Sequence, residues 1–221
     1  MQIHNYIKTS MIDYPGKLSC VVFTQGCMWK CWYCQNAELL SIGKGQVDEQ
    51  EVLDFLKTRR GQLDGVVLCG GEPTLQKDLA EFAKKIKDLG FLVKLDTNGT
   101  NPIMLKKLLE QNLIDYVAMD IKTNIERYQE VTCVPTNIEA IKECIDILKN
   151  SKIDYEFRTT AIPSLSQDDI VNIAKMLQGA RHYYLQTYIR PTPAHQKAIY
   201  TAQDLQAIAQ KCKQYIPTSI R

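Results

Sequence analysis

Short apolar runs alternate with longer amphipathic runs along this chain, and this alternation limits the possible folds more than any other feature. The short runs are rich in β-branched and aromatic residues, and the longer runs repeat with the 3.6-residue period of helices. The pattern predicts strands at 18–24, 65–69, 91–96, 116–120, 155–160 and 182–187. It predicts helices at 49–60, 77–89, 103–111, 138–150, 167–177 and 202–215.

Six strand–helix units predict an α/β fold in which parallel strands are joined by right-handed crossovers. A complete eightfold barrel takes about 250 residues, and this chain has 221. We therefore expect a partial (β/α)6 TIM-like barrel, with a doubly wound sheet as the alternative. No internal repeat, low-complexity segment or long linker divides the sequence, so we expect a single domain over residues 1–221.

The charge and the cysteine content limit the classes of function. A net charge of +2 and a pI near 8.0 argue against nucleic acid or an anionic membrane as a partner. No apolar run approaches the ~18 residues of a transmembrane helix, and the first residues lack the basic and apolar regions of a secretory signal. We therefore expect a cytoplasmic protein, in which eight cysteines indicate metal or redox chemistry rather than disulfides.

Three of the cysteines, Cys27, Cys31 and Cys34, form a C-x3-C-x2-C motif directly after the first predicted strand. Iron–sulfur clusters of the four-iron type are normally held by four thiolates. Three thiolates on one loop would hold three irons and leave the fourth iron free for another ligand, which favours one-electron chemistry there. Structural zinc is the alternative, but such sites use four Cys or His ligands, typically in two pairs, and no second pair lies nearby.

The remaining cysteines and the histidines have ordinary structural explanations. A free cysteine behaves as a small buried hydrophobe, and the others show no paired spacing: Cys20, Cys69, Cys133, Cys144 and Cys212. A second cluster is therefore not expected. The histidines lack metal-ligand spacing; His4 and His182 are expected to be structural, while His195 could border the site.

Polar clusters follow the carboxyl ends of the later predicted strands, where barrels and open parallel sheets bind ligands. Gly70-Gly71-Glu72-Pro73 follows the second strand, and Asp96-Thr97-Asn98-Gly99 follows the third. The fourth strand ends at Asp120, Lys122 lies two residues later, and Arg158 lies near the end of the fifth. Because these ends meet at one rim, we expect the clusters to form one site with the cysteine loop.

Each cluster alone also has a structural explanation. Gly-Gly and Asn-Gly are ordinary turn dipeptides, and Glu72 could be a solvated loop carboxylate. Asp120 and Lys122 have i, i+2 spacing, so both side chains would point into a barrel interior, which is costly without a polar partner. That pair therefore favours a functional role, whereas Arg158 could equally form a structural ion pair.

The motifs resemble those of a known family. Cys27-x3-Cys31-x2-Cys34, with Tyr33 before the last cysteine, is similar to the signature of the radical S-adenosylmethionine (radical SAM) enzymes, and Gly70-Gly71-Glu72-Pro73 is similar to their second motif. The segments Ile12-Asp13-Tyr14-Pro15-Gly16-Lys17 and Phe23-Thr24-Gln25-Gly26-Cys27 resemble the glycyl-radical activating enzymes. Within that group, they resemble specifically the activators of anaerobic ribonucleoside-triphosphate reductase.

The resemblance implies a role for each motif. Cys27, Cys31 and Cys34 would ligate three irons of one 4Fe–4S cluster, and the methionyl group of S-adenosylmethionine would bind the fourth iron. The remaining residues would surround that ligand. Gly70, Gly71 and Glu72 would lie near its amine, and Tyr33 would lie near its adenine. Asp96, Thr97 and Asp120 would surround its carboxylate and a monovalent cation, and Lys122 and Arg158 would neutralise the same carboxylate.

The resemblance also implies the reaction. One-electron cleavage of S-adenosylmethionine would give a 5′-deoxyadenosyl radical, which would install a glycyl radical on the partner enzyme, and a flavodoxin or ferredoxin would supply the electron. No side-chain general base is then required. The alternatives are an activase of a different glycyl-radical enzyme, a small radical SAM enzyme such as a 7-carboxy-7-deazaguanine synthase, or a structural zinc- or cluster-binding protein. One departure is Gln35, where many of these activases carry histidine.

Overall fold

The computed structural model describes residues 1–189 and 200–221. Within them the strands form one eight-stranded sheet whose spatial order follows the chain order from β1 to β8. The strands are β1 (Ile3–Ser10), β2 (Ser19–Thr24), β3 (Gly65–Gly70), β4 (Leu92–Thr97), β5 (Tyr116–Asp120), β6 (Asp154–Thr160), β7 (Tyr183–Gln186) and β8 (Thr218–Ile220). β1 is antiparallel to β2, and every later neighbouring pair is parallel.

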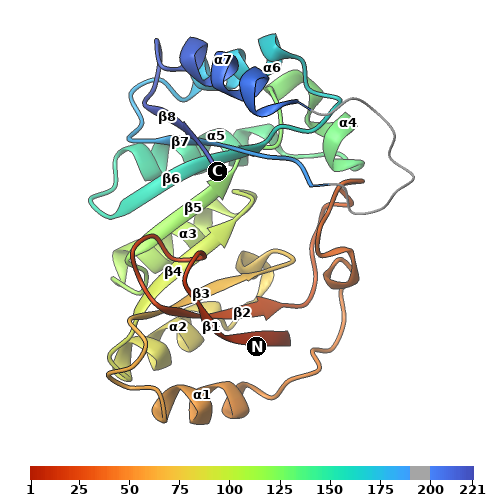
Figure 1. Cartoon of the computed structure of the whole chain (residues 1–221). Helices are drawn as coiled ribbons and strands as arrows, with labels where there is room; N and C mark the ends of the chain where they lie inside the picture. The colour runs from red at the N-terminus through yellow and green to blue at the C-terminus, as the bar shows by residue number, and fades with distance from the viewer. Residues whose placement is uncertain (190–199) are drawn as a thin grey trace.

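The sheet is strongly curved, and β1 and β8 are its two edges rather than a hydrogen-bonded pair. Figure 1 looks onto the side between these edges, where the curved sheet remains open. The fold is therefore the partial TIM-like barrel that the six strand–helix units predict, with one additional strand at each edge. An open side gives a large ligand access to the interior without passing the ends of the strands.

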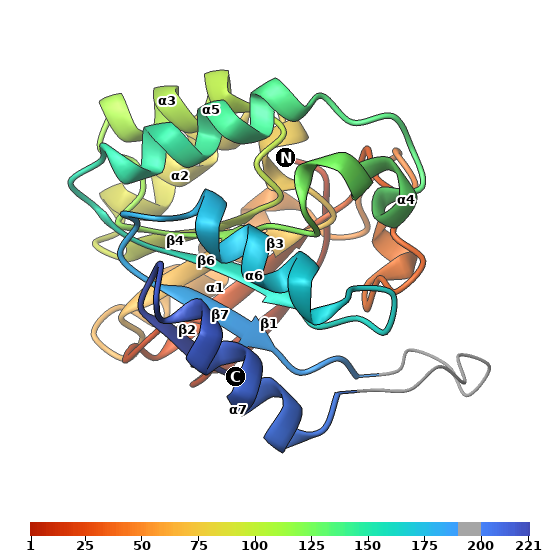
Figure 2. The same cartoon turned by 90° about the horizontal axis from the view of Figure 1, so that it is seen from above.

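Helices connect the parallel strands and cover the outer face of the sheet. They are α1 (Glu49–Lys57), α2 (Leu79–Asp88), α3 (Pro102–Glu110), α4 (Tyr128–Thr132), α5 (Ile138–Lys149), α6 (Gln167–Met176) and α7 (Ala202–Cys212), with short 3-10 turns η1 (Ala37–Leu39), η2 (Pro73–Leu75) and η3 (Ile125–Arg127). Figure 2 shows α2, α3 and α5 side by side over the sheet. Asp48 caps α1 and Ser166 caps α6 with a capping box, so side-chain oxygens satisfy amides that each first turn leaves unpaired.

The two faces of the sheet differ because successive strand residues point to opposite sides. Val66, Leu68, Val93, Leu95 and Val117 point outward and belong to the main hydrophobic core beneath the helices. The alternate residues of the same strands point into the barrel. A smaller cluster inside the barrel consists of Tyr14, Val21 and Val67, with Phe23, Cys69, Leu92 and Tyr116 packed against it.

The sequence pattern missed β1, β8 and α4. β1 is an edge strand whose residues are largely polar and exposed, so it lacks the apolar alternation of a half-buried strand. β8 has only three residues, and α4 has only five, which is too short for a periodic pattern. In the described part of the chain, no helix is long and apolar enough to cross a membrane. His195 lies outside the described residues.

Candidate functional site

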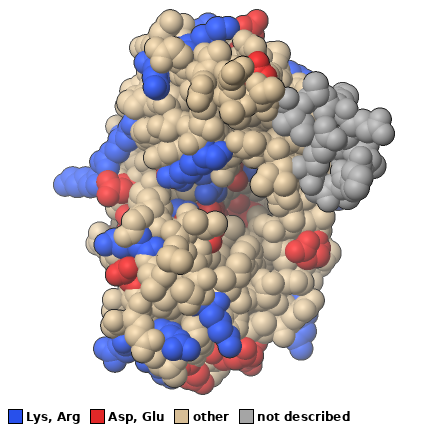
Figure 3. Space-filling model, viewed as in Figure 1, with Lys and Arg blue, Asp and Glu red and all other residues tan. Residues whose placement is uncertain are grey.

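A pocket of about 480 Å³ occupies the barrel at the carboxyl ends of the strands. Its lining includes every site residue that the sequence predicts: Cys27, Cys31, Tyr33, Cys34, Gly70, Gly71, Glu72, Asp96, Thr97, Asp120, Lys122 and Arg158. Figure 3 shows the hollow on the open side, with acidic and basic atoms next to each other at its bottom. The sequence clusters therefore meet in one cavity, although they come from five different strands.

The cysteine loop leaves the end of β2 and rests against α4, as Figure 1 shows at the right of the molecule. The Lys30 amide donates to the Thr132 carbonyl at 2.9 Å, and the Trp29 ring packs edge-on against Tyr128 with 5.9 Å between centroids. Within the loop, the Cys34 amide donates to the Cys31 carbonyl at 3.0 Å. These contacts hold the loop at the mouth of the pocket, although it has almost no regular secondary structure.

All three cysteines of the loop are free thiols that line the pocket. Burial raises the pKa of the Cys31 thiol to about 11, so it is neutral at pH 7 unless a cation such as iron removes its proton. Among the described residues, no three His, Cys, Asp or Glu side chains converge as ligands of a single metal ion would. Thiolates that each ligate a different iron of a cluster need not converge in that way.

Gly70 and Gly71 bring the backbone at the end of β3 unusually close to its neighbours. A Cβ atom at Gly70 would overlap the backbone of Thr24, and one at Gly71 would overlap the backbone of Gly26. Gly70 also has a φ of +122°, a conformation that side chains rarely adopt. Only glycine fits at these two positions, and as a result bare backbone lines the pocket beside the cysteine loop.

Glu72 is a buried, hydrogen-bonded side chain rather than a solvated loop carboxylate. Its Oε1 accepts hydrogen bonds from the Thr74 hydroxyl at 2.6 Å and the Thr97 hydroxyl at 2.7 Å, and its Oε2 accepts from the Asn98 amide at 2.7 Å. Burial raises the pKa of Glu72, against the effect of these donors. The contacts join the turn after β3 to the end of β4, so Glu72 fixes the shape of this wall of the pocket.

A chain of ion pairs crosses the floor of the pocket. Arg158 donates from Nη1 to Asp96 at 2.9 Å and from Nε to Asp120 at 2.8 Å. Lys122 pairs with the other oxygen of Asp120 at 3.0 Å, and Lys94 pairs with Asp96. Three cations therefore alternate with two carboxylates, which leaves one positive charge in excess.

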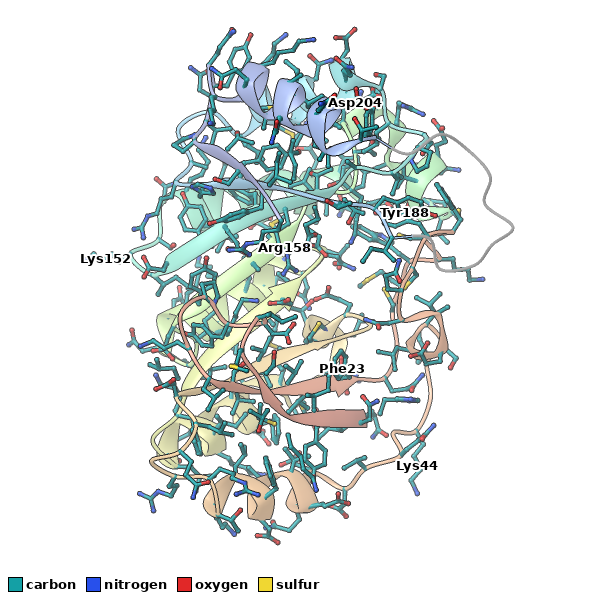
Figure 4. All side chains as sticks on the ribbon, in the orientation of Figure 1. Phe23, Lys44, Lys152, Arg158, Tyr188 and Asp204 are labelled. Atoms are coloured by element: carbon teal, nitrogen blue, oxygen red, sulfur yellow. The ribbon has the colours of Figure 1, made fainter. Side chains whose placement is uncertain are left out.

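Asp120 is ionised throughout the neutral range. Burial alone would raise its pKa, but the charges of Arg158 and Lys122 outweigh burial and lower the pKa to about 2. Figure 4 shows Arg158 extending into the open side of the barrel, opposite Phe23 on β2. An anionic ligand that enters here would meet Lys122 and Arg158, the cations of the ion-pair chain that line the pocket.

Tyr33 lies beneath the ion-pair chain at the cysteine loop. Its side chain is buried, its ring lies 6.0 Å from the Lys122 ammonium, and its hydroxyl has no hydrogen-bond partner among the described residues. Gln35, at the position where the sequence departs from many activases, donates to the Ile189 carbonyl at 2.6 Å. That bond joins the cysteine loop to the segment after β7.

The other cysteines and histidines behave largely as expected. Cys20, Cys144 and Cys212 are buried, and Cys133 is exposed at the end of α4. Cys69 differs, because it points inward and lines the pocket. His4 is hydrogen-bonded to the Gln25 side chain and His182 to the Ser219 hydroxyl, so both have structural partners.

Sequence reasoning missed several residues of the pocket region. Lys94 belongs to the ion-pair chain, and Asp13, Gln186 and Thr187 line the cavity. Lys94 had a usable signal, since it lies two residues before Asp96 on the same face of one strand. Asp13 lies in the segment that resembles the activating enzymes, but that segment is in the loop between β1 and β2, so without β1 nothing placed it at the pocket.

Comparison with known proteins agrees with this geometry. Residues 21–177 match the family model of the radical SAM superfamily. A protein of Methanocaldococcus jannaschii, named as a candidate glycyl-radical enzyme activating enzyme, is 38% identical over 195 residues, which are 84% of this chain and 79% of that protein. The pyruvate formate-lyase 1-activating enzyme of Escherichia coli is 28% identical over 179 residues, which are 76% of this chain and 70% of that enzyme.

Solved structures agree on the fold. A radical SAM methyltransferase from Sphaerobacter thermophilus superposes with a TM-score of 0.75 at 18% identity, over 94% of this chain and 67% of that one. The family match covers most of the sheet and the whole cysteine loop. The chain therefore belongs to the radical SAM superfamily, and it is an enzyme of the glycyl-radical activating kind within that superfamily.

Proposed function

We propose that this enzyme installs a glycyl radical on anaerobic ribonucleoside-triphosphate reductase, using one 4Fe–4S cluster and S-adenosylmethionine. The observation that carries the proposal is the single pocket in which three free thiols, a bare glycine backbone and a chain of charged residues meet. The segment from Asp13 to Gly16, which resembles the activators of this reductase, supports the choice of partner.

The residues of the pocket fit the two cofactors. Cys27, Cys31 and Cys34 are free thiols outside any disulfide, so all three are available to ligate iron. Gly70 and Gly71 have no side chains, so bare backbone lines this wall of the pocket, where a ligand amine could approach it. Lys122 and Arg158, the two cations of the ion-pair chain that line the pocket, fit a ligand carboxylate.

The cofactors, when bound, supply one-electron cleavage and a 5′-deoxyadenosyl radical that removes a hydrogen atom from the partner's glycine. The chain itself holds and shields the reacting groups. Glu72 keeps the turn after β3 against β4, and the Gln35 bond to Ile189 keeps the cysteine loop against the segment after β7. The open side between β1 and β8 would admit a glycine loop of a folded partner.

The test combines the anaerobically reconstituted and reduced enzyme with S-adenosylmethionine and the reductase. We expect the EPR doublet of a glycyl radical on the reductase, and no doublet when its radical glycine is replaced by alanine. The Cys31→Ala enzyme is the matched negative control. Cleavage of S-adenosylmethionine without a doublet would reject the reductase as the partner.

Pyruvate formate-lyase is the second candidate partner, because activating enzymes of that name are 28% identical to this chain. The same assay with pyruvate formate-lyase in place of the reductase separates the two partners. We expect the larger yield of radical with the reductase. A doublet only on pyruvate formate-lyase would keep the activase assignment and change its target.

A further inference from the structure

A second ion pair lies deeper in the barrel than the ion-pair chain. Glu156 on β6 is completely buried, and its two carboxylate oxygens accept hydrogen bonds from Nη1 and Nη2 of Arg221 at 2.6 Å and 2.9 Å. The Tyr116 hydroxyl donates to the same carboxylate at 2.6 Å. This carboxylate is therefore fully paired, although none of its partners lines the pocket.

Arg221 is held in place from three sides. Its amide donates to Leu185 and its carbonyl accepts from Thr187, both at 2.9 Å, so its backbone extends the pairing of β8 with β7. Its guanidinium stacks on the Tyr184 ring at 3.6 Å. The side chain is therefore fixed at the edge of the sheet, where it is partly exposed, and its guanidinium reaches the buried Glu156 from there.

Glu156 competes with the pocket carboxylates for cations. It lies two residues before Arg158 on the same face of β6, so its charge acts on the Arg158 guanidinium as those of Asp120 and Asp96 do. The other nearby cation, Lys94, is 6.0 Å from the Tyr116 ring and paired with Asp96. Without Arg221, the buried carboxylate would draw one of these two cations away from Asp96.

We propose that Arg221 is a positioning residue for S-adenosylmethionine: by neutralising Glu156 it leaves Arg158 to Asp96 and Asp120 at the floor of the pocket. This inference rests on the proposed function, because the ligand carboxylate is what the ion-pair chain would meet. It assigns a role in ligand binding to a side chain that does not line the pocket. The role is indirect, so Arg221 itself need not touch the ligand.

The test measures the dissociation constant of S-adenosylmethionine by calorimetry on anaerobically reconstituted enzyme, at a temperature where every variant is folded. Arg221→Gln should weaken binding about tenfold, or ~1.4 kcal/mol. Glu156→Gln alone should change it less than about threefold, since Arg221 is partly exposed and remains solvated. The double variant should return to within about threefold of the parent enzyme, because the competing charge is gone.

Arg127→Gln is the matched control. Like Arg221, Arg127 is a partly exposed arginine in an ion pair: it pairs with Asp169 at 2.5 Å, and its side chain is 28% exposed, against 36% for Arg221. Neither arginine lines the pocket. Its loss should lower the melting temperature without changing the dissociation constant.

An Arg221→Gln enzyme that binds S-adenosylmethionine as tightly as the parent overturns the inference and leaves the proposed function intact. The inference also fails if the double variant binds as weakly as Arg221→Gln. A parent enzyme that binds no S-adenosylmethionine removes the proposed function and this inference together.

Discussion

The barrel interior has two walls of opposite character. β2 and β3 contribute Val21, Phe23, Val67 and Cys69, which pack into an apolar cluster with Tyr14. β4, β5 and β6 contribute charged side chains at the equivalent inward positions: Lys94, Asp96, Asp120, Glu156 and Arg158. The apolar wall carries the cysteine loop and the glycine turn at its end, whereas the charged wall carries the ion-pair chain.

The difference separates stability from ligand binding. Burial of the apolar wall stabilises the fold in proportion to its area. Buried ion pairs contribute little net stability, because the desolvation of two charges offsets most of their attraction. Charges that stabilise the fold so weakly are better explained by a ligand that uses them. Substitutions on the apolar wall should therefore act mainly on the free energy of unfolding, and substitutions on the charged wall mainly on the dissociation constant of S-adenosylmethionine.

The largest effect is expected at the loop that the apolar wall carries. Cys31→Ala removes one of three thiolates at the pocket mouth, so we expect loss of the iron–sulfur cluster and of all S-adenosylmethionine cleavage. Iron and sulfide content after anaerobic reconstitution measures the first, and release of 5′-deoxyadenosine measures the second. Cys144→Ala, in a buried cysteine of the outer core, is the control and should keep its full iron content.

Next comes a substitution within the apolar wall itself. Val67→Ala removes two buried methyl groups beside Tyr14 and should lower the free energy of unfolding by about 2 kcal/mol. Because Val67 does not line the pocket, the affinity for S-adenosylmethionine should change less than about twofold. Urea denaturation and ligand titration on one preparation test both. A large loss of affinity would mean that the two walls are not independent.

The charged wall should respond to acid. The pKa of Asp120 is lowered from 3.8 to about 2. Relative to protonated Asp120, the ionised form therefore stabilises the fold by about 2 kcal/mol above pH ~4, and this difference is lost as the pH falls through ~2. Asp120→Asn lacks this contribution at every pH. The difference in unfolding free energy between parent and variant should therefore shrink by about that amount in acid. If the difference in unfolding free energy between parent and variant is the same at pH 5 and pH 2, the pKa of Asp120 is not lowered by its cationic partners.

The part of the fold that the sequence could predict is the part with a buried, periodic pattern. The six parallel strands and their helices were predicted because each strand has an apolar outer face beneath a helix, which produces periodic patterns over many residues. β1 and β8 lie at the sheet edges, where exposure and short length remove that pattern. Local periodicity reports burial, and these elements are the least buried part of the sheet.

The candidate site was predictable for a different reason. Cys27, Cys31 and Cys34, and likewise Gly70 and Gly71, are close in sequence, so spacing alone groups them. The Glu156–Arg221 pair joins residues 65 positions apart, and no short motif contains both. Contacts of this kind depend on which strands become neighbours, which a single sequence does not state.

The smallest effect should separate a pocket charge from a surface charge. Lys122→Met keeps most of the side-chain volume but removes one of the two cationic partners of Asp120, at 3.0 Å, and one of the two cations proposed to bind the ligand carboxylate. S-adenosylmethionine should therefore bind about tenfold more weakly. Lys84→Met is the matched control, because Lys84 pairs with Asp88 on the exposed face of α2 and such pairs contribute less than ~1 kcal/mol. Its ligand affinity should equal that of the parent. Equal affinities for both variants would show that the excess positive charge of the floor does not meet the ligand carboxylate, and Arg158 would then be the cation to test.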